Sequence, residues 1–310
     1  MHHLNSVIDQ YLDYCCYQKR VSAKTIRAYR TDLLQFAKQF PDESIDAITT
    51  SILEGYIRGL HQEYMPKTVK RKIASLRAFF HYLDYRDMLE YNPFHKLQVR
   101  FREPAVLPKT IPLSVIEQFL SDLYHKKEAL TSGYAQKKIL RDIAIIELLF
   151  STGIRISELC SLKPVNIDLY ENVILINGKG SKQRRIQLGN EAVIYALRDY
   201  KEAYKGLIEP DGYFFVNRYG SRLSDQSIRV MINQYTHASA IDLHLTPHMF
   251  RHTFATCLLE ADVDIRFIQE LLGHSSITIT EIYTHVAVAK QKSILSTRHP
   301  RMKLVTDGNK

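Results

Sequence analysis

The chain has 310 residues, 45% of them hydrophobic, which is enough for two domains with apolar cores. It has no apolar run of about 18 residues, which argues against a membrane-spanning helix. Its N-terminus, MHHLNSVIDQ, lacks the basic and apolar regions of a signal peptide. The formal net charge is +9; residues 1–110 carry 17 Lys and Arg against 12 Asp and Glu, and residues 111–310 carry 25 against 21. A positive excess in both halves favours a polyanionic partner, although a basic surface also serves solubility.

The cysteines indicate a reducing compartment. None belongs to a C-x-x-C pair, and the adjacent Cys15 and Cys16 cannot easily bridge each other. The other two are Cys160 and Cys257. This usage predicts a cytoplasmic protein with free thiols.

Residues 23–40, AKTIRAYRTDLLQFAKQF, predict an amphipathic helix with Ser22 as its N-cap. Its apolar stripe consists of Ile26, Tyr29, Leu33, Ala37 and Phe40. Its opposite side carries Lys24, Arg27, Thr31 and Lys38.

Residues 67–85 repeat this design. The inward positions are Val69, Ile73, Leu76, Phe80 and Leu83, and the outer arc holds Lys67, Lys70, Arg71 and Arg77. A charged outer face is ordinarily only solvated, but these two faces carry almost no acidic residues. They therefore predict contacts with a DNA groove and its phosphates. The candidate DNA-binding residues are Lys24, Arg27, Lys67, Lys70 and Arg71.

Between about residues 92 and 112 the chain contains four prolines and little periodicity, which indicates a linker. We therefore expect a helical N-terminal domain at 1–95, a linker at 96–110 and a second domain at 111–310. The second domain opens with helices predicted near 113–124 and 139–150, separated by the polar stretch HKKEALTSGYAQKK.

Short β-like runs follow Pro164: VNIDLY, VILIN and RRIQL. The turn NGKGSKQ joins the last two, so a small antiparallel sheet is predicted. Further helices complete a mixed α/β domain in a protein that is mainly α.

The stretch TPHMFRHTFAT begins with a helix-start signal, Thr246 as N-cap and Pro247 at the first helical position. His248 and Arg251 then share one face of the first turn, where the helix N-terminus and the guanidinium favour an anion. A zinc site using His248 and His252 is disfavoured, because Met249 replaces the glutamate of H-E-x-x-H and no third ligand is evident. His252 is predicted to be buried and hydrogen-bonded.

Other candidates are weak when taken singly. Arg155 and Glu158 are three residues apart, a spacing that usually means an ordinary salt bridge. Lys179 lies in the glycine-containing turn, where a lysine is usually solvated. A helix starting at Asp264 and ending at Gly273 would deliver His274 just past its end. Tyr283 follows on a further short helix.

Taken together, these segments resemble the tyrosine recombinase family of site-specific DNA recombinases, in particular its Xer-type and phage-integrase-like members. The matching segments, in order, are TGIRISELCSL, GKGSKQR, PHMFRHTFAT, IQELLGHSSITITEIYTHV and HPR. The basic N-terminal half resembles the family's helical, SAM-like core-binding domain, and the second domain resembles its catalytic domain. Two departures are a longer segment at about 126–138 and a short tail, MKLVTDGNK.

The resemblance implies that Tyr283 attacks a DNA phosphodiester to give a 3′-phosphotyrosine and a 5′-hydroxyl. It implies His248 as base, Lys179 as acid, and Arg155, Arg251 and His274 as stabilisers of the transition state. Glu158 would orient one of these side chains. No metal, cofactor or ATP is implied.

The implied partner is double-stranded DNA with a specific recombination site, recombined through a Holliday junction by a homotetramer or by a heterotetramer with a related recombinase. Residues 287–310 would dock on a neighbouring protomer. The role would be chromosome dimer resolution or integration and excision of a mobile element. The alternatives are a type IB topoisomerase-like enzyme that relaxes DNA and a DNA-binding accessory protein without catalysis.

Overall fold

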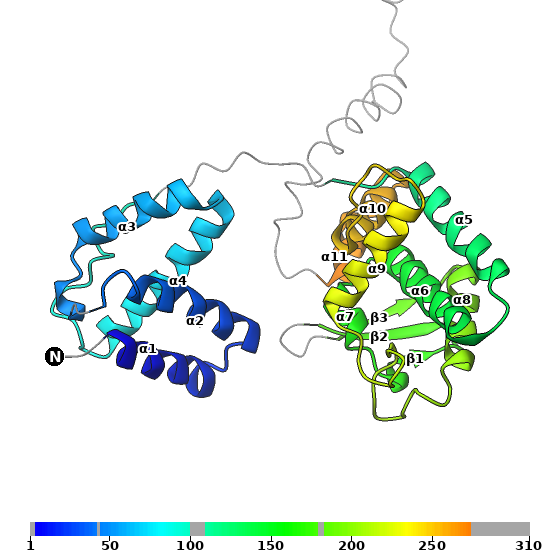
Figure 1. The fold of residues 1–310 in the computed structure, drawn as a ribbon, viewed down its shortest axis with the longest axis horizontal. Coiled ribbons are helices and arrows are strands. Elements are labelled where there is room, and N and C mark those ends of the chain that lie inside the picture. The colour runs from blue at the N-terminus through cyan, green and yellow to red at the C-terminus, as the bar shows by residue number, and fades with distance from the viewer. Residues whose placement is uncertain (1–3, 42–43, 100–108, 179–182, 274–310) are drawn as a thin grey trace, which may run out of the picture. The chain divides into compact units, whose positions relative to one another are not determined.

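The structure is a computed structural model that describes residues 4–41, 44–99, 109–178 and 183–273. The chain divides into two compact units, Met1–Ala105 and Val106–Lys310, and each has its own hydrophobic core. Helices dominate both units, and the second contains a small antiparallel sheet (Figure 1). The predicted fold class is therefore confirmed. Within the described ranges, no helix is long and apolar enough to cross a membrane.

The N-terminal unit is a helical bundle. Its elements are α1 (Leu4–Asp13), the π-helical turn η1 (Tyr14–Gln18), α2 (Ala23–Ala37), the 3-10 turn η2 (Ile45–Ala47), α3 (Thr50–Glu63) and α4 (Pro66–Tyr85). Helix α2 packs against both α1 and α4. The predicted inward positions of α4 are all buried: Val69, Ile73, Leu76, Phe80 and Leu83.

Helix α2 starts where the sequence predicts, because the Ser22 hydroxyl accepts a hydrogen bond from the Thr25 backbone N–H at 3.3 Å. It ends earlier than predicted, at Ala37 instead of residue 40. The next backbone bonds close tighter turns, with the Phe40 N–H bonded to the Ala37 carbonyl at 3.1 Å. Phe40 nevertheless packs on the ring of Phe36, so the apolar stripe continues past the helix.

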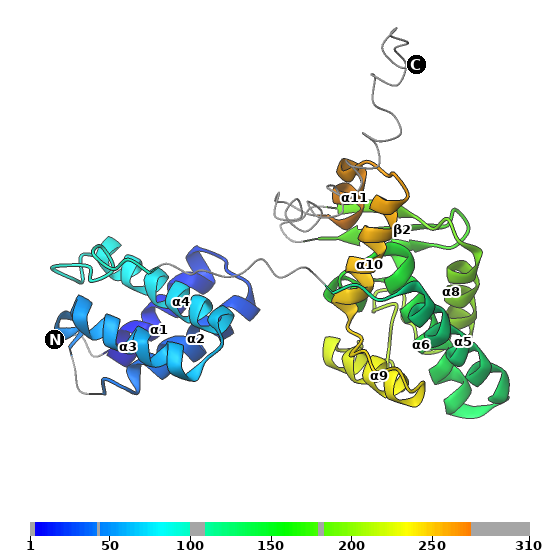
Figure 2. The same ribbon diagram turned by 90° about the horizontal axis from the view of Figure 1, so that it is seen from above.

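The C-terminal unit surrounds one central helix. Its elements are α5 (Leu113–Ala129), α6 (Gly133–Thr152), α7 (Ile156–Cys160), η3 (Pro164–Asn166), β1 (Ile167–Asp168), β2 (Val173–Asn177), β3 (Gln183–Gln187), α8 (Glu191–Ala203), α9 (Asp225–Ala238), α10 (Pro247–Glu260) and α11 (Ile265–Leu272). Helices α5, α8 and α10 pack on α6, whose C-terminal half is almost entirely buried (Figures 1 and 2).

Helices α5 and α6 are longer than predicted and take up most of the polar 126–138 segment. Lysines of that segment form ion pairs and cation–π contacts with other residues of the unit. Lys127 pairs with Asp199 at 2.7 Å, and Lys138 pairs with the buried Asp142 at 2.7 Å. The ammonium groups of Lys126 and Lys138 both lie 5.1 Å from the ring centroid of Tyr235. Polar sequence that resembles a loop is therefore helical, because its charges meet partners within α6 and on the neighbouring helices α8 and α9.

The sheet has the order β1-β2-β3, with antiparallel neighbours. Ile174 pairs with Ile186, and Ile176 pairs with Arg184. Successive strand residues face opposite sides, so Arg184 lies on the same face as the buried Ile186, and Arg185 lies on the other. Helix α11 packs beside both β3 and α10.

The predicted helix signals around the candidate site are present. Thr246 accepts a hydrogen bond from the Met249 N–H, and Asp264 accepts one from the Arg266 N–H. Gly273 ends α11 in the left-handed conformation, with φ +64°. Farther along α10, the buried Thr253 hydroxyl accepts the Ile111 N–H at 2.7 Å, which ties the start of the second unit to this helix.

A buried carboxylate joins α2 to α4. Asp32, on α2, is 1% exposed and lies among polar groups of α4. It accepts hydrogen bonds from the Arg71 guanidinium, from Ser75 Oγ at 2.8 Å and from Lys72 Nζ at 3.4 Å. Lys72 is also bonded to Gln35. Asp32 therefore offsets the charge of a buried lysine and at the same time holds a surface arginine.

We expect Asp32→Ala to lower the free energy of unfolding by about 3 kcal/mol or more, because it leaves the buried Lys72 ammonium without its counterion. Urea denaturation of the full chain measures the loss, and hydrogen exchange of peptides from α2 and α4 assigns it to this unit. Asp9→Ala is the matched control; the Asp9–Arg30 pair is exposed, and we expect a change below about 1 kcal/mol. Equal effects of the two variants would contradict this role of Asp32.

Candidate active site

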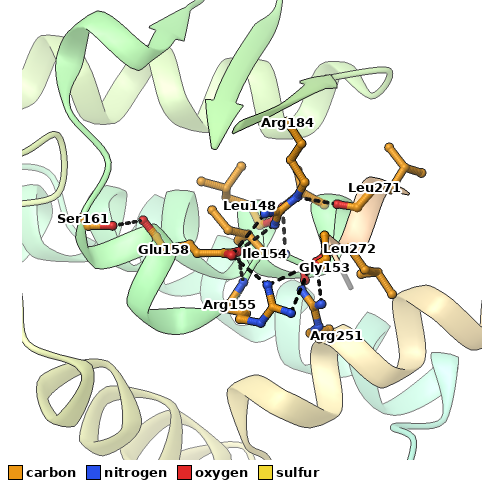
Figure 3. A network of polar contacts seen from close by, with 12 residues as sticks. Leu148, Gly153, Ile154, Arg155, Glu158, Ser161, Arg184, Arg251, Leu271 and Leu272 are labelled. Atoms are coloured by element: carbon orange, nitrogen blue, oxygen red, sulfur yellow. Dashed lines mark hydrogen bonds and ion pairs between the residues drawn. The ribbon is translucent and has the colours of Figure 1, made fainter. Parts of the chain in front are cut away.

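Three arginines meet at the C-terminal end of α11 (Figure 3). They come from separate elements: Arg155 precedes α7, Arg184 lies on β3 and Arg251 on α10. Their acceptors include the backbone carbonyls of residues 271–273. The last carbonyls of a helix lack intrahelical partners and carry partial negative charge, so they attract cationic side chains.

Arg155 is the most exposed of the three, with 33% of its side chain accessible. Its guanidinium donates to Glu158 Oε1 at 2.8 Å, to the Leu272 carbonyl at 3.3 Å and to the Gly273 carbonyl at 3.1 Å. Its backbone N–H donates to Glu158 Oε2 at 3.0 Å. The predicted pair with Glu158 therefore forms, and it is part of a larger network.

Arg251 is buried, with 5% of its surface exposed. One terminal nitrogen donates to the Gly153 carbonyl at 2.6 Å and the other to the Leu272 carbonyl at 2.7 Å. The structure thus brings Arg155 and Arg251 to the same acceptor, the Leu272 oxygen, from positions 96 residues apart in the chain.

Arg184 completes the cluster, and it is not among the site residues predicted from the sequence. Its two terminal nitrogens bond the two oxygens of Glu158, at 3.1 and 2.7 Å, and its Nε donates to the Leu271 carbonyl at 2.7 Å. The alternation of side chains along β3 could have indicated it, because Arg184 is two residues from Ile186 and so lies on the same inward face.

Two glycines in the left-handed conformation allow this close packing. A Cβ on Gly153, at φ +58°, would lie 2.6 Å from a ring carbon of Phe254 and 2.8 Å from a methyl of Leu272. A Cβ on Gly273, at φ +64°, would lie 2.9 Å from Nη1 of Arg184. Both glycine carbonyls accept an arginine, Gly153 from Arg251 and Gly273 from Arg155.

The cluster has an excess of positive charge. Its three guanidinium groups share one carboxylate, Glu158, which is 7% exposed and is bound by Arg155 and Arg184, while Arg251 binds the carbonyls of Gly153 and Leu272. Burial alone would raise the pKa of Glu158, but hydrogen bonds from Arg184 and from the Arg155 backbone outweigh it and leave the pKa lowered. The carboxylate is therefore ionised at neutral pH, and three positive charges against one negative charge favour an anion such as phosphate.

Of the two histidines on α10, His248 is exposed and His252 is half-buried. Burial lowers the pKa of His252, and His248 and Arg251 lower it further, so this imidazole is neutral at pH 7. No group of three His, Cys, Asp or Glu side chains that could hold a metal ion is found in the described part of the chain. Lys179, His274, Tyr283 and the tail at 287–310 lie outside the described residues.

The candidate DNA-binding residues are on α2 and α4 of the N-terminal unit, and all are exposed: Lys24, Arg27, Lys67, Lys70 and Arg71. Arg71 differs from a simple surface cation because it is paired with the buried Asp32 and still exposes 45% of its side chain. Asp32 lies next to Leu33 of the apolar stripe and is not among the residues predicted from the sequence.

Two family models match the chain. Residues 116–290 match the phage integrase family, and residues 8–86 match the phage integrase N-terminal SAM-like domain. Among curated relatives, a tyrosine recombinase of Agathobacter rectalis is 56% identical over 301 residues, covering 97% of this chain and 98% of the relative. XerC of Bacillus pumilus is 34% identical, with 95% and 96% covered, and XerD of Listeria monocytogenes is 34% identical, with 96% and 100% covered.

Solved structures show the same architecture. XerH bound to its palindromic difH substrate has a TM-score of 0.73 at 24% identity, covering 94% of this chain and 84% of that one. XerA recombinase has a TM-score of 0.52 at 27% identity, covering 96% and 99%.

We expect Gly273→Ala to lower the free energy of unfolding by about 1–3 kcal/mol, because alanine is strained at φ +64° and its methyl would displace Arg184. Thermal and urea denaturation measure the change. Gly189→Ala serves as control, since a Cβ there meets no atom within 4 Å and the backbone needs no left-handed conformation. A Gly273→Ala protein as stable as the control would refute the packing role of this glycine.

Proposed function

The chain belongs to the phage integrase family of tyrosine recombinases, and we propose that Tyr283 is the nucleophile with which it breaks and rejoins DNA at a specific site. As a tyrosine recombinase, it is an enzyme of DNA recombination. The proposal assigns the remaining roles to Arg155, Lys179, His248, Arg251 and His274.

The observation that carries the proposal is the shared acceptor of Arg155 and Arg251. Both guanidinium groups donate to the Leu272 carbonyl oxygen, at 3.3 and 2.7 Å. Two guanidinium groups that meet at one oxygen atom are close enough to bind the oxygens of one phosphate. The excess positive charge around Glu158 favours such a group, and the partial exposure of Arg155 gives it access.

The first step is attack by the Tyr283 oxygen on the phosphorus atom. A free tyrosine has a pKa near 10, so roughly one molecule in a thousand is phenolate at pH 7, a deficit of about 4 kcal/mol. His248 is exposed at the start of α10 and takes the phenolic proton in this proposal. A positioned base contributes about 100- to 10,000-fold.

The transition state gathers negative charge on the non-bridging phosphate oxygens. Arg155 and Arg251 hold these oxygens with donors that are already ordered, and His274 adds another. The departing 5′-oxygen takes a proton from Lys179. The product is a 3′-phosphotyrosine, which preserves the energy of the broken bond, so a 5′-hydroxyl of a second strand can rejoin it without ATP.

The guanidinium groups supply the positive charge, and the proposal therefore requires no metal ion or cofactor. The partner is double-stranded DNA, with the basic faces of α2 and α4 binding its phosphates and grooves. Four protomers would exchange strands through a Holliday junction in the cytoplasm, with residues 287–310 docking between protomers. Curated relatives include Xer recombinases, and solved structures include phage and transposon integrases. The proposal therefore covers both chromosome dimer resolution and the movement of mobile elements.

We expect the protein to form a covalent adduct with a nicked suicide duplex that carries its binding site, selected from a random DNA pool. The adduct appears as a shifted band on a denaturing gel and persists in EDTA. Tyr283→Phe should abolish the band, because it removes the attacking oxygen and little else. A band that persists in Tyr283→Phe would mean that the nucleophile is another residue, and loss of the band in EDTA would indicate a metal-dependent enzyme.

We expect Arg155→Ala to reduce the rate of adduct formation by at least about 100- to 1,000-fold, while DNA affinity stays within about tenfold. Single-turnover cleavage and gel-shift titration measure the two quantities. Arg198→Ala is the control, since the exposed Arg198 also donates to a backbone carbonyl, that of Leu169, but lies outside the cluster. Equal losses of binding and cleavage in Arg155→Ala would show that this arginine is only structural.

A further inference from the structure

The side chain of Arg184, on the short strand β3, is buried and hydrogen-bonded. It is 8% exposed, and both of its terminal nitrogens bind the Glu158 carboxylate, whereas those of Arg251 bind backbone carbonyls. The charge of Arg184 is therefore already paired with an anion of the protein. Each of its three guanidinium nitrogens is engaged: Nη1 and Nη2 bind the two oxygens of Glu158, and Nε binds the Leu271 carbonyl. A lysine could not replace this planar fork, because its single nitrogen cannot reach three separate acceptors in one plane.

The contacts of Arg184 connect it to Arg155 through a shared carboxylate. Glu158 Oε1 accepts from Arg155 Nη1 and from Arg184 Nη1, and Oε2 accepts from the Arg155 backbone and from Arg184 Nη2 (Figure 3). With both oxygens bound by Arg184, the carboxylate cannot rotate freely. The guanidinium of Arg155 is therefore held in one place by a carboxylate that is itself held.

The contacts of Arg184 also reach the last turn of α11. Arg184 binds the carbonyl of residue 271, Arg155 and Arg251 bind that of residue 272, and Arg155 binds that of residue 273. The Arg184 side chain also packs closely against Gly273, since a Cβ on Gly273 would lie 3.3 Å from Cδ and Cζ of Arg184. Arg184 thus fixes both the carboxylate and the helix end against which the other two arginines are placed.

We propose that Arg184 is a positioning residue that aligns the Arg155 guanidinium for phosphate binding by locking Glu158 and the end of α11. This inference rests on the proposed function, in which Arg155 stabilises the transition state. Arg184 does not touch the DNA. Its effect is on the orientation of a side chain that does, and a displacement of about 1 Å at such a group can cost about 100-fold in rate.

The test uses Arg184→Met, Arg184→Lys and Arg185→Met in the full-length protein, with Arg155→Ala for comparison. Arg185 is the matched control, because it is the next residue of β3, carries the same charge and is exposed on the opposite face. The substrates are two nicked suicide duplexes of the selected site. One has the natural scissile phosphate, and the other has a single methylphosphonate stereoisomer, in which a methyl replaces a non-bridging oxygen and removes the negative charge.

We expect Arg184→Met to slow adduct formation on the natural phosphate by about 100-fold, with DNA affinity within about threefold of wild type. Arg184→Lys should remain slower by at least about tenfold although it keeps the charge, and Arg185→Met should match wild type. On the neutral linkage, less charge develops and the guanidinium groups matter less. The deficit of Arg184→Met should therefore shrink, as that of Arg155→Ala does.

Three results would overturn the inference while leaving the proposed function intact. One is cleavage at the wild-type rate by Arg184→Lys. This variant keeps the positive charge, so it tests the need for the guanidinium fork even if Arg184→Met does not fold. Another is normal cleavage by a folded Arg184→Met. The last is a deficit of equal size on both linkages, which a merely structural arginine would give. A wild-type protein that forms no adduct dependent on Tyr283 would instead overturn the proposed function and the inference with it.

Discussion

The arrangement of the catalytic unit depends on placing three guanidinium groups around the end of one short helix. Like charges so close together repel, and the repulsion is strong where little water is present. Two features offset it: the carbonyls of residues 271–273, which carry the negative end of the helix dipole, and the single carboxylate of Glu158. The arginines fix the end of α11, and α11 in turn provides the acceptors that hold the arginines. Gly153 and Gly273 are part of the same constraint, because neither position has room for a Cβ.

The same balance makes the cluster insensitive to pH near neutrality. Glu158 is ionised because its arginine hydrogen bonds outweigh the cost of its burial, so its lowered pKa lies outside the neutral range. His252 stays neutral because burial and the nearby cations lower its pKa. The positive excess that favours a phosphate is thus constant across physiological pH. Any pH dependence of the reaction in that range must come from groups outside this cluster.

The sequence predicted what local patterns can encode. It predicted the start of α10 at Thr246-Pro247, the end of α11 at Gly273 and the Arg155–Glu158 pair, because caps and three-residue spacings lie within a single element. It missed Arg184. The partner of this arginine, Glu158, is 26 residues away, and their contact depends on how β3 packs against α7 and α11. It also placed the ends of α5 and α6 too far apart, since Lys127 pairs with Asp199 on α8, and Lys126 and Lys138 lie against the Tyr235 ring on α9, partners that only the folded domain supplies.

The buried Asp32 shows that the N-terminal unit uses the same device as the catalytic unit. In each unit an almost fully buried carboxylate binds an arginine that remains partly exposed, Arg71 by Asp32 and Arg155 by Glu158. A long side chain loses about 1.5–2 kcal/mol of conformational entropy when it is ordered. Where the fold has already ordered the guanidinium, a phosphate that binds it does not bear that cost again. Burying a carboxylate is expensive in itself, and in both units it leaves an arginine that is partly exposed and already ordered.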